Sequence, residues 1–459
     1  MVIENTSARK RWGLPNLTPS QILVIGFAVL IFLGAALLTL PAAVADGQSI
    51  RFLDALFTST SATCVTGLIV FDTGTKFSLF GQIVIITLIQ IGGLGFMTFS
   101  TLIALIIRKK IGLRARVVMQ EAFNLFTPSG VVRLAVKILL ITAFFEVSGA
   151  IILSWRFAQY LPLGTAIYYG IFHSISAFCN AGFDLLGRIF GPFASIVPLN
   201  QDFFITMTVS VLVIFGGLGF PVIANVMASW GKKRERLVLH SRLVITMTVL
   251  LLVIGTLLVW AIEYANPETL GPLPGWAKVT NAFFHSMTTR TAGYNSVNIG
   301  AMHQATLFIS TALMFIGASP CSTGGGVKTS TLGVLLASVV SIIKGKRDTE
   351  IFRRRIATDA VFKAIAVIFM ALSVVLLVTL VLSITEAAPF LNLLFEAMSA
   401  FGTVGLTTGI TPTLSDIGRV LIIALMYIGR LGPLTLAVAI GQRHYPPSLH
   451  YPEERVMIG

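Results

Sequence analysis

Residues 391–405 read Leu391-Asn-Leu-Leu-Phe-Glu-Ala-Met-Ser-Ala-Phe-Gly-Thr-Val-Gly405, a short apolar segment followed by a small polar turn that glycine closes. A helix needs about 20 apolar residues to cross a bilayer, so this segment is too short to cross. Similar units, closed by Gly67, Gly182 and Gly293, occupy residues 52–67, 169–182 and 281–293. The closing glycines stand 115, 111 and 112 residues apart, and such a period indicates internal repeats.

Longer apolar runs of bilayer length flank each of these units. They lie near residues 21–42, 81–107, 137–155, 203–229, 243–264, 305–342, 361–384 and 418–441. The sequence therefore predicts an all-α integral membrane protein with eight transmembrane helices. Four repeats of span, re-entrant pore helix, turn and span are expected to surround a pseudo-fourfold pore. The expected repeat boundaries are residues 1–127, 128–240, 241–355 and 356–459.

A second set of glycines recurs in the span that follows each turn. Repeats 1 and 2 contain Gly-Gly-Leu-Gly, which begins at Gly92 and Gly216, and the matching glycines of repeats 3 and 4 are Gly317 and Gly429. Small residues let membrane helices pack closely, which is a sufficient structural explanation of these glycines. It does not explain the polar turns, which end on glycine at one depth in all four repeats.

The composition is that of a membrane protein. Of the 459 residues, 55% are hydrophobic and 11% are charged, whereas soluble domains carry about 25% charged residues. Cys64, Cys179 and Cys321 are far apart, which argues against a metal cage or a disulfide scaffold. The first apolar run, from Gln21 to Leu40, has the length of a full span, so we expect no cleavable signal peptide.

The net charge of +14 comes largely from basic clusters beside the spans. These clusters lie at residues 9–11, 108–116, 232–242 and 344–355. Connections rich in Lys and Arg face the cytoplasm, so we expect cytoplasmic N and C termini in a multi-pass protein of the plasma membrane. Binding of nucleic acid is the weaker interpretation, because the clusters lack interleaved aromatic residues and topology already explains them.

The polar turns predict an ion-selective pore. Irregular backbone at membrane depth is tolerated only where it is buried in protein or lines a water-filled path. Rings of backbone carbonyls can replace the hydration shell of K+, and glycine allows the φ values that aim carbonyls inward. With one glycine per turn, we expect fewer ion sites than in a K+ channel. The expected filter, with K+ at its backbone carbonyls, comprises Thr63, Cys64, Val65, Thr66, Gly67, Phe178, Cys179, Asn180, Ala181, Gly182, Thr289, Arg290, Thr291, Ala292, Gly293, Phe401, Gly402, Thr403, Val404 and Gly405.

The second span of repeat 3 cannot be one continuous helix. Residues 317–330 contain a proline and three consecutive glycines, all of which disfavour a helix. The order Gly326-Val327-Lys328-Thr329 differs from the Gly-Lys-Ser/Thr of a phosphate-binding loop, which argues against nucleotide binding. We expect a flexible gate below the filter, and a water-filled kink is the alternative. The expected gate comprises Ala318, Ser319, Pro320, Cys321, Ser322, Thr323, Gly324, Gly325, Gly326, Val327, Lys328, Thr329 and Arg430.

Arg430 replaces the second glycine of the Gly-Gly-Leu-Gly motif in repeat 4. A charge at the bilayer centre costs roughly 3 kcal/mol or more, so this side chain must face protein or water. We expect its guanidinium to donate to carbonyls of the broken loop. A purely structural anchor is the alternative.

The four single-glycine turns, the Gly-Gly-Leu-Gly spans and the broken sixth span resemble the Ktr/Trk/HKT superfamily of potassium transporters over the whole chain. The short N terminus is most similar to that of the Ktr membrane subunit. The resemblance implies potassium uptake, stimulated by Na+, by a homodimer on a cytosolic ring of nucleotide-binding RCK subunits. It also implies that Arg430 matches the gating arginine of the family.

Arg290 distinguishes the third turn, which is one residue shorter than the second. A cation in the ion path would repel K+, so we expect Arg290 to point behind the filter, toward an outer acid such as Glu268. A structural ion pair is the plain interpretation of that arrangement.

No catalytic set of residues is present in the sequence, which predicts neither an enzyme nor a cofactor beyond transported or activating K+ and Na+. Whether transport is channel-like or coupled stays open. The main alternative function is an ion-coupled carrier, driven by protons or sodium, of another cation. Away from the ends of the spans, the charged residues are Glu146, Lys328 and Arg430, fewer than we expect of a proton-coupled carrier. A scaffold that conducts no ions is a third class.

Overall fold

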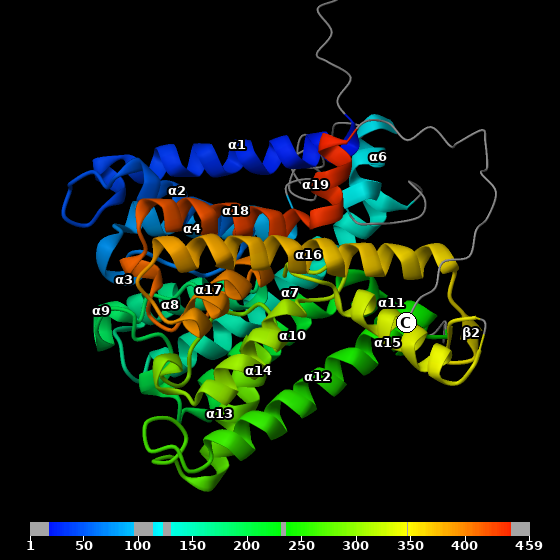
Figure 1. Ribbon diagram of the computed structural model, residues 1–459. Coiled ribbons are helices and arrows are strands. Elements are labelled where there is room, and N and C mark those ends of the chain that lie inside the picture. Colours follow the sequence, from blue (N-terminus) through cyan, green and yellow to red (C-terminus); the bar gives the residue numbers. More distant parts are fainter. Residues whose placement is uncertain (1–17, 96–112, 123–129, 231–235, 347, 442–459) are drawn as a thin grey trace, which may run out of the picture.

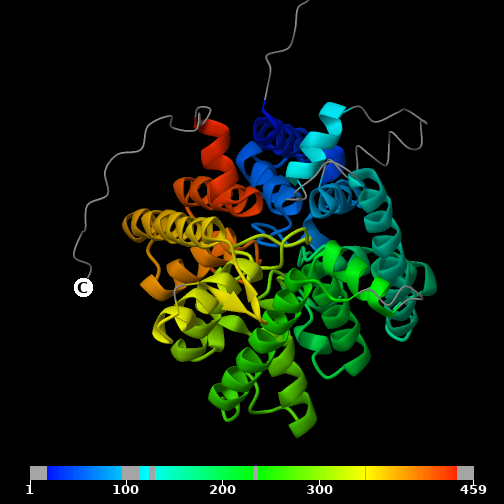
Figure 2. The ribbon, with the colours of Figure 1, turned by 90° about the vertical axis from the view of Figure 1, so that its right-hand side faces the viewer.

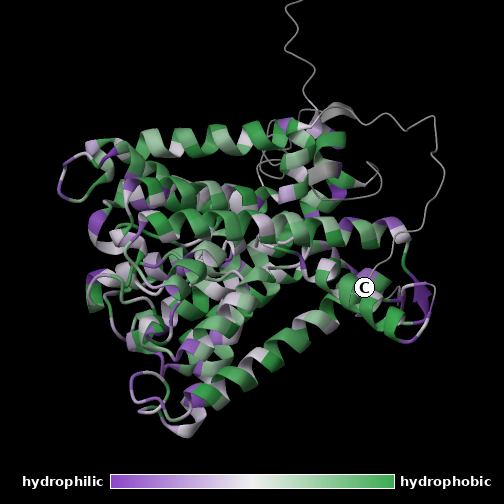
Figure 3. Cartoon of the chain, in the orientation of Figure 1, coloured by the Kyte–Doolittle hydropathy of each residue, from purple (hydrophilic) through white to green (hydrophobic). Residues whose placement is uncertain are grey.

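The computed structural model describes residues 18–95, 113–122, 130–230, 236–346 and 348–441. Within these residues, four helices are long and apolar enough to cross a membrane. They are α1 (Pro19–Thr39), α7 (Val131–Phe157), α12 (Leu239–Glu263) and α16 (Thr358–Thr385). Most of their residues are hydrophobic (Figure 3), and such helices are stable where lipid replaces water.

The second long element of each unit is shorter, and in the last three units it is interrupted within the described residues. These elements are α4 (Leu79–Leu94), α10 (Phe203–Leu218), α14 (Gln304–Phe315) and α18 (Asp416–Leu431). After α10 the chain continues as α11 (Phe220–Trp230) at 98°, and after α18 as α19 (Pro433–Ile440) at 93°. The remainder of the run expected at residues 81–107 lies outside the described residues from residue 96 onward.

The two sharp bends correct the prediction of uninterrupted spans over residues 203–229 and 418–441. They fall at Gly219 and Gly432, the last glycines of their motifs, whose φ values are 93° and 85°. Such φ values lie outside the α-helical region and are readily adopted only by glycine. If each bent pair is one span, the described residues contain up to six candidate spans, and the eight-span arrangement stays a prediction.

The predicted break in the sixth span is confirmed. Helix α14 ends at Phe315, and α15 (Thr329–Ile343) begins after a loop of residues 316–328. Lys328, at the N-cap of α15, has extended backbone. The two halves of the run at residues 305–342 are therefore separate helices.

A short helix overlaps each of the four segments in which the sequence predicts a pore helix, whereas the repeat arrangement stays a prediction. These helices are α2 (Phe52–Cys64), α8 (Leu163–Phe178), α13 (Gly275–Thr288) and α17 (Phe390–Gly402). A fully buried phenylalanine lies at a matching position in each of them: Phe57, Phe172, Phe284 and Phe395. Figure 2 shows the four groups of helices in chain order around a common centre.

The same hydrogen bond fixes three of these short helices to the preceding long helix. Ser59 Oγ donates to the Ile31 carbonyl at 2.7 Å, Ser174 Oγ to Glu146 at 2.7 Å and Ser286 Oγ to Leu252 at 3.0 Å. Three residues after each acceptor is a glycine, at Gly34, Gly149 and Gly255. A Cβ on any of them would lie within 2.6 Å of the serine hydroxyl. These equivalent contacts support the repeat assignment.

The smaller elements lie at the ends of the long helices (Figure 1). They are α3 (Thr73–Lys76), α6 (Leu113–Ala122), α9 (Gly187–Phe190) and the 3-10 turns η1 (Pro41–Ala43), η2 (Val197–Leu199), η3 (Ile299–Ala301) and η4 (Thr411–Thr413). Strands β1 (Glu350–Ile351) and β2 (Arg354–Arg355) form a small antiparallel hairpin between α15 and α16. This hairpin is a minor correction to the all-α prediction.

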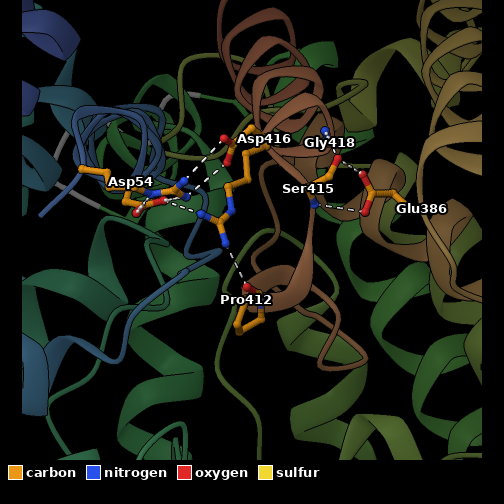
Figure 4. A network of polar contacts seen from close by, with 8 residues as sticks. Asp54, Glu386, Pro412, Ser415, Asp416 and Gly418 are labelled. Atoms are coloured by element: carbon orange, nitrogen blue, oxygen red, sulfur yellow. Dashed lines mark hydrogen bonds and ion pairs between the residues drawn. The ribbon is translucent and has the colours of Figure 1, made fainter.

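A polar network joins the first and last repeats (Figure 4). The Asp54 carboxylate on α2 accepts from Arg51 Nε at 3.0 Å and from Arg419 Nη1 of α18 at 2.5 Å. Arg51 also pairs with Asp416 at 3.1 Å. The Asp54 side chain is only 4% exposed, whereas that of Asp416 is 63% exposed. The buried member of the network therefore dominates its contribution to stability.

Asp54→Ala should lower the stability of the protein much more than Asp416→Ala. Breaking a buried ion pair costs about 3–5 kcal/mol because one charge is left without a partner, whereas an exposed pair contributes about 0–1 kcal/mol. Thermal unfolding in detergent, followed by the loss of the monodisperse peak in size-exclusion chromatography, measures the difference. Equal losses in the two variants would show that the burial of Asp54 does not determine its contribution to stability.

Candidate ion pathway

The four short helices α2, α8, α13 and α17 lead into turns with one backbone conformation. Two residues before each closing glycine, a non-glycine residue adopts a left-handed conformation, with φ between 51° and 70°. These residues are Val65, Asn180, Thr291 and Thr403. The closing glycines also have positive φ, from 69° at Gly182 to 95° at Gly67. Non-glycine residues are uncommon in this region, so the surrounding structure must impose it.

Backbone hydrogen bonds close the turns in equivalent ways. In repeats 1, 2 and 4, the N–H before the closing glycine donates at 2.8 Å to a serine carbonyl five residues back. The third turn is a residue shorter, and there Ala292 N donates at 3.0 Å to the Thr288 carbonyl, four residues back. The shortening noted in the sequence is therefore accommodated within the turn, and the closing glycine keeps its place.

The closing glycines form a closed ring in chain order. A Cβ on Gly67 would lie 2.5 Å from the Ala181 carbonyl oxygen, and one on Gly182 would lie 2.7 Å from that of Ala292. A Cβ on Gly293 would lie 2.8 Å from the Val404 carbonyl oxygen. One on Gly405 would lie 2.2 Å from that of Thr66, in the first turn, which closes the series. Carbonyls of the four turns thus converge at one place, and only glycine permits such approach.

The glycines of the second motif bring the following helix against the turns. A Cβ on Gly92 would lie 1.9 Å from the Thr63 carbonyl oxygen. One on Gly216 would lie 1.9 Å from the Phe178 carbonyl oxygen, and one on Gly429 would lie 1.8 Å from the Phe401 carbonyl oxygen. Each of these three carbonyl groups belongs to the residue four positions before the closing glycine of its repeat. In repeat 3, Gly317 instead faces Gly325 of the loop at 2.1 Å. Close packing, the structural explanation given to these glycines, is confirmed.

The loop of residues 316–328 lies against several turns at once. Thr323 Oγ1 is 3.0 Å from the Asn180 amide, and Gly325 N donates to Thr403 Oγ1 at 3.0 Å. A Cβ on Gly324 would lie 2.1 Å from Thr291 Oγ1. The loop therefore contacts the second, third and fourth turns on the side where α8, α13 and α17 enter them.

Further backbone bonds hold the loop in a defined conformation. Gly317 N donates to the Val327 carbonyl at 2.9 Å, so the two ends of the loop are joined. Ser319 N donates to Gly217 at 3.0 Å, and Gly326 N donates to Gly429 at 3.3 Å. The expected gate residues from Ala318 to Lys328 thus lie in one hydrogen-bonded loop, whereas Thr329 begins α15 and Arg430 lies on α18.

Two basic side chains bind loop carbonyls. Arg430 donates to the Thr323 carbonyl of the loop and to the Gly92 and Gly93 carbonyls of α4, the last at 3.1 Å. Lys328 Nζ donates to the Gly324 carbonyl at 2.7 Å. The expected donation from Arg430 to the loop is confirmed. The bond from Lys328 was missed, although its position four residues after Gly324 was a usable signal.

Arg290 points behind the third turn, as expected, but not toward Glu268. Its side chain is buried, and Nη1 donates to the Thr248 carbonyl of α12 at 3.4 Å. Glu268 is exposed, and among the described residues no ion pair joins the two. The expected partner was wrong because the sequence does not reveal which part of α12 the third turn faces.

The residues expected to form the filter are brought together, with most side chains buried around the ring. Beyond the loop is a cavity of about 460 Å³, lined by the loop, by the ends of α4 and α18 and by α1, α16 and α19. Among the described residues, none of the four turns lines this cavity. The loop therefore separates the cavity from the glycine ring.

Comparisons with known proteins agree with this architecture. The family model described as TrkH, cation transport protein, matches residues 8–446. The chain is 43% identical to the Ktr system potassium uptake protein B of Bacillus subtilis, over 96% of this chain and 97% of that protein. It is 42% identical to the potassium/sodium uptake protein NtpJ of Enterococcus hirae, over the full length of both.

Among solved structures, the crystal structure of the potassium transporter TrkH from Vibrio parahaemolyticus superposes with a TM-score of 0.73. It covers 94% of this chain and 87% of that one at 17% identity, which shows a shared fold. The family model and the close relatives extend over nearly the whole chain. This multi-pass membrane protein therefore belongs to the TrkH family of cation transport proteins.

Proposed function

We propose that the chain takes up potassium across the plasma membrane through the ring of four turns. The observation that carries the proposal is the closed series of glycine-to-carbonyl contacts, which gathers backbone oxygens from all four repeats. Such oxygens can replace the water around a monovalent cation. The printed names of the relatives, potassium uptake and potassium/sodium uptake, support K+ as the transported ion. In this proposal the turn residues form the filter.

The loop of residues 316–328 and Arg430 serve as the gate in this proposal. The loop contacts three turns of a four-turn ring, so it lies across the ion route. Arg430 adds a positive charge there and fastens the loop to α4. Opening then requires the loop carbonyls to leave Arg430 and Lys328.

Ion flux into liposomes tests the proposed function. Purified chain reconstituted in neutral lipid should pass K+ and Rb+ faster than Na+ and Li+, because the wider, weakly hydrated ions match carbonyl coordination better. Equal flux of all four ions, or none in folded protein, would refute potassium selectivity. Flux that requires a proton or sodium gradient would favour the second candidate, an ion-coupled carrier of another cation.

The assembly is proposed from the Ktr system name of the Bacillus subtilis relative and from the basic connections. We infer a homodimer with cytoplasmic termini, stimulated by Na+, on a cytosolic ring of RCK-type nucleotide-binding subunits. The exposed basic side chains Lys344, Arg353 and Arg354 beside the β hairpin support a contact with an acidic surface.

Co-purification at low salt should retain a cytosolic nucleotide-binding subunit, because charge contacts are least screened there. Raising the salt from 50 to about 500 mM should release part of that subunit, since the Debye length falls to a few ångströms. Recovery of this chain without any cytosolic protein at low salt would contradict the proposal. In that case the basic clusters would serve orientation and lipid headgroups.

A further inference from the structure

The cavity beyond the loop combines two cationic groups with apolar walls. Lys328 and Arg430 line it together with the loop. The carbonyls that they bind, Gly324 and Thr323, are consecutive, so the two charges are neighbours. Among the described residues, no carboxylate lies within 4.0 Å of either group, and none lines the cavity.

The bound carbonyls solvate these charges without neutralising them. Carbonyl oxygens carry partial negative charge only, so two positive charges remain at one end of the cavity. Both side chains are partly buried, where the local dielectric is lower than in water and the attraction for an anion is correspondingly stronger. An anionic group entering the cavity would therefore be drawn to this end.

The remaining walls are mostly apolar. Leu23 and Phe27 of α1, Val367 of α16 and Leu434 and Val438 of α19 contribute to them. Val438 lines the cavity and is 53% exposed. The neighbouring helices α1 and α16 have membrane length and carry exposed apolar residues such as Val29 and Phe369. A hydrocarbon chain that enters between these helices would therefore meet apolar side chains.

We propose that this cavity binds a single-chain amphiphilic anion, with its head group at Lys328 and Arg430 and its chain along α1 and α19. A volume of about 460 Å³ is within the range of small-molecule sites, which are mostly apolar with a few polar groups that orient the ligand. Carboxylate and phosphate head groups share the required charge. The ligand is therefore a long-chain fatty acid or a lysophospholipid.

The functional consequence rests on the proposed function. An ion that passes the loop must cross this cavity, so a bound hydrocarbon chain obstructs it. The anion also holds Lys328 and Arg430 in place beside the loop. Occupancy of the cavity therefore inhibits potassium flux.

The test measures binding without reference to transport. The purified chain in nanodiscs of neutral phosphatidylcholine is titrated with dansyl-undecanoate, whose fluorescence rises in apolar sites. Oleate, oleoyl-lysophosphatidate and uncharged oleyl alcohol then compete with the probe. We expect saturable binding and displacement at least tenfold weaker by the alcohol than by one of the anions. The stronger anion identifies the source of the ligand, and displacement by neither anion, or equally by the alcohol, overturns the proposal.

Two variants of α19 locate the site. Val438→Trp fills the cavity and should weaken probe binding at least tenfold, whereas Ile440→Trp, on the same helix at a position 80% exposed and outside the cavity lining, should leave it unchanged. If the two variants weaken probe binding equally, in protein that is still monodisperse, the probe binds elsewhere and the proposed site is wrong. Oleate should also reduce K+ flux about tenfold in the unaltered chain. If the chain passes K+ but does not bind the probe, the cavity site alone is refuted. If the chain binds the probe but passes no K+ even without oleate, the proposed function alone is refuted.

Discussion

Gly405→Ser and Gly293→Ser should each reduce the selectivity for K+ over Na+ by at least tenfold. Both glycines have positive φ, 92° and 81°, which costs a residue with a Cβ roughly 1 to 2 kcal/mol. The new Cβ would also lie 2.2 Å from the Thr66 carbonyl oxygen at Gly405 and 2.8 Å from that of Val404 at Gly293. Because about 1.4 kcal/mol changes binding tenfold, a displaced carbonyl is sufficient for this loss.

Gly409→Ser is the matched control for this prediction. Gly409 also has positive φ, 98°, but a Cβ there would meet nothing within 4 Å. It should therefore share the backbone strain and keep the K+/Na+ ratio, measured by flux in liposomes. An unchanged ratio in both Gly293→Ser and Gly405→Ser would exclude the ring as the filter.

Removing part of Ser322–Gly326, or changing Arg430→Ala, should raise K+ flux several-fold. Each change removes the bond between Arg430 and the Thr323 carbonyl, and charge-assisted hydrogen bonds contribute about 1.5 to 3 kcal/mol. The loop then leaves the turns more often. The double variant should gain less than the sum of the two, because both changes act on one contact.

Arg133→Ala is a suitable control because Arg133 is an exposed arginine of α7 away from the loop. Its K+ flux should equal that of the unaltered chain. If flux falls in both the loop deletion and Arg430→Ala, in protein that elutes as the native oligomer, the loop supports the pore and does not block it.

The four short helices and their turns were predictable because they depend on the types of nearby residues. Glycine at 67, 182, 293 and 405, and the apolar segments before it, specify short helices that end in turns without reference to the rest of the chain. The broken helix before Lys328 was predictable for the same reason, since proline and glycine act locally. Arg430 could be placed near the loop because a charge in a span requires polar partners.

Other features depend on contacts between distant residues and could not be predicted. Val65, Asn180, Thr291 and Thr403 share a left-handed backbone although they are a valine, an asparagine and two threonines, so the packed turn and not the residue type imposes it. The bend at Gly219 was missed because glycine is also tolerated inside membrane helices. The partner of Arg290 depends on the register of α12 against the third turn, which local sequence does not determine.

The contact between Gly405 and the Thr66 carbonyl has a consequence for biosynthesis. The residues that close the ring are separated by nearly the whole chain, so the ring is incomplete until the last repeat has left the ribosome. Until then three polar turns have no fourth neighbour, in an environment that penalises unpaired backbone. A nascent chain that stops before residue 405 should lose the entire ion site. It would expose an open polar cleft, which cellular quality control should recognise, and would not be a partly active transporter.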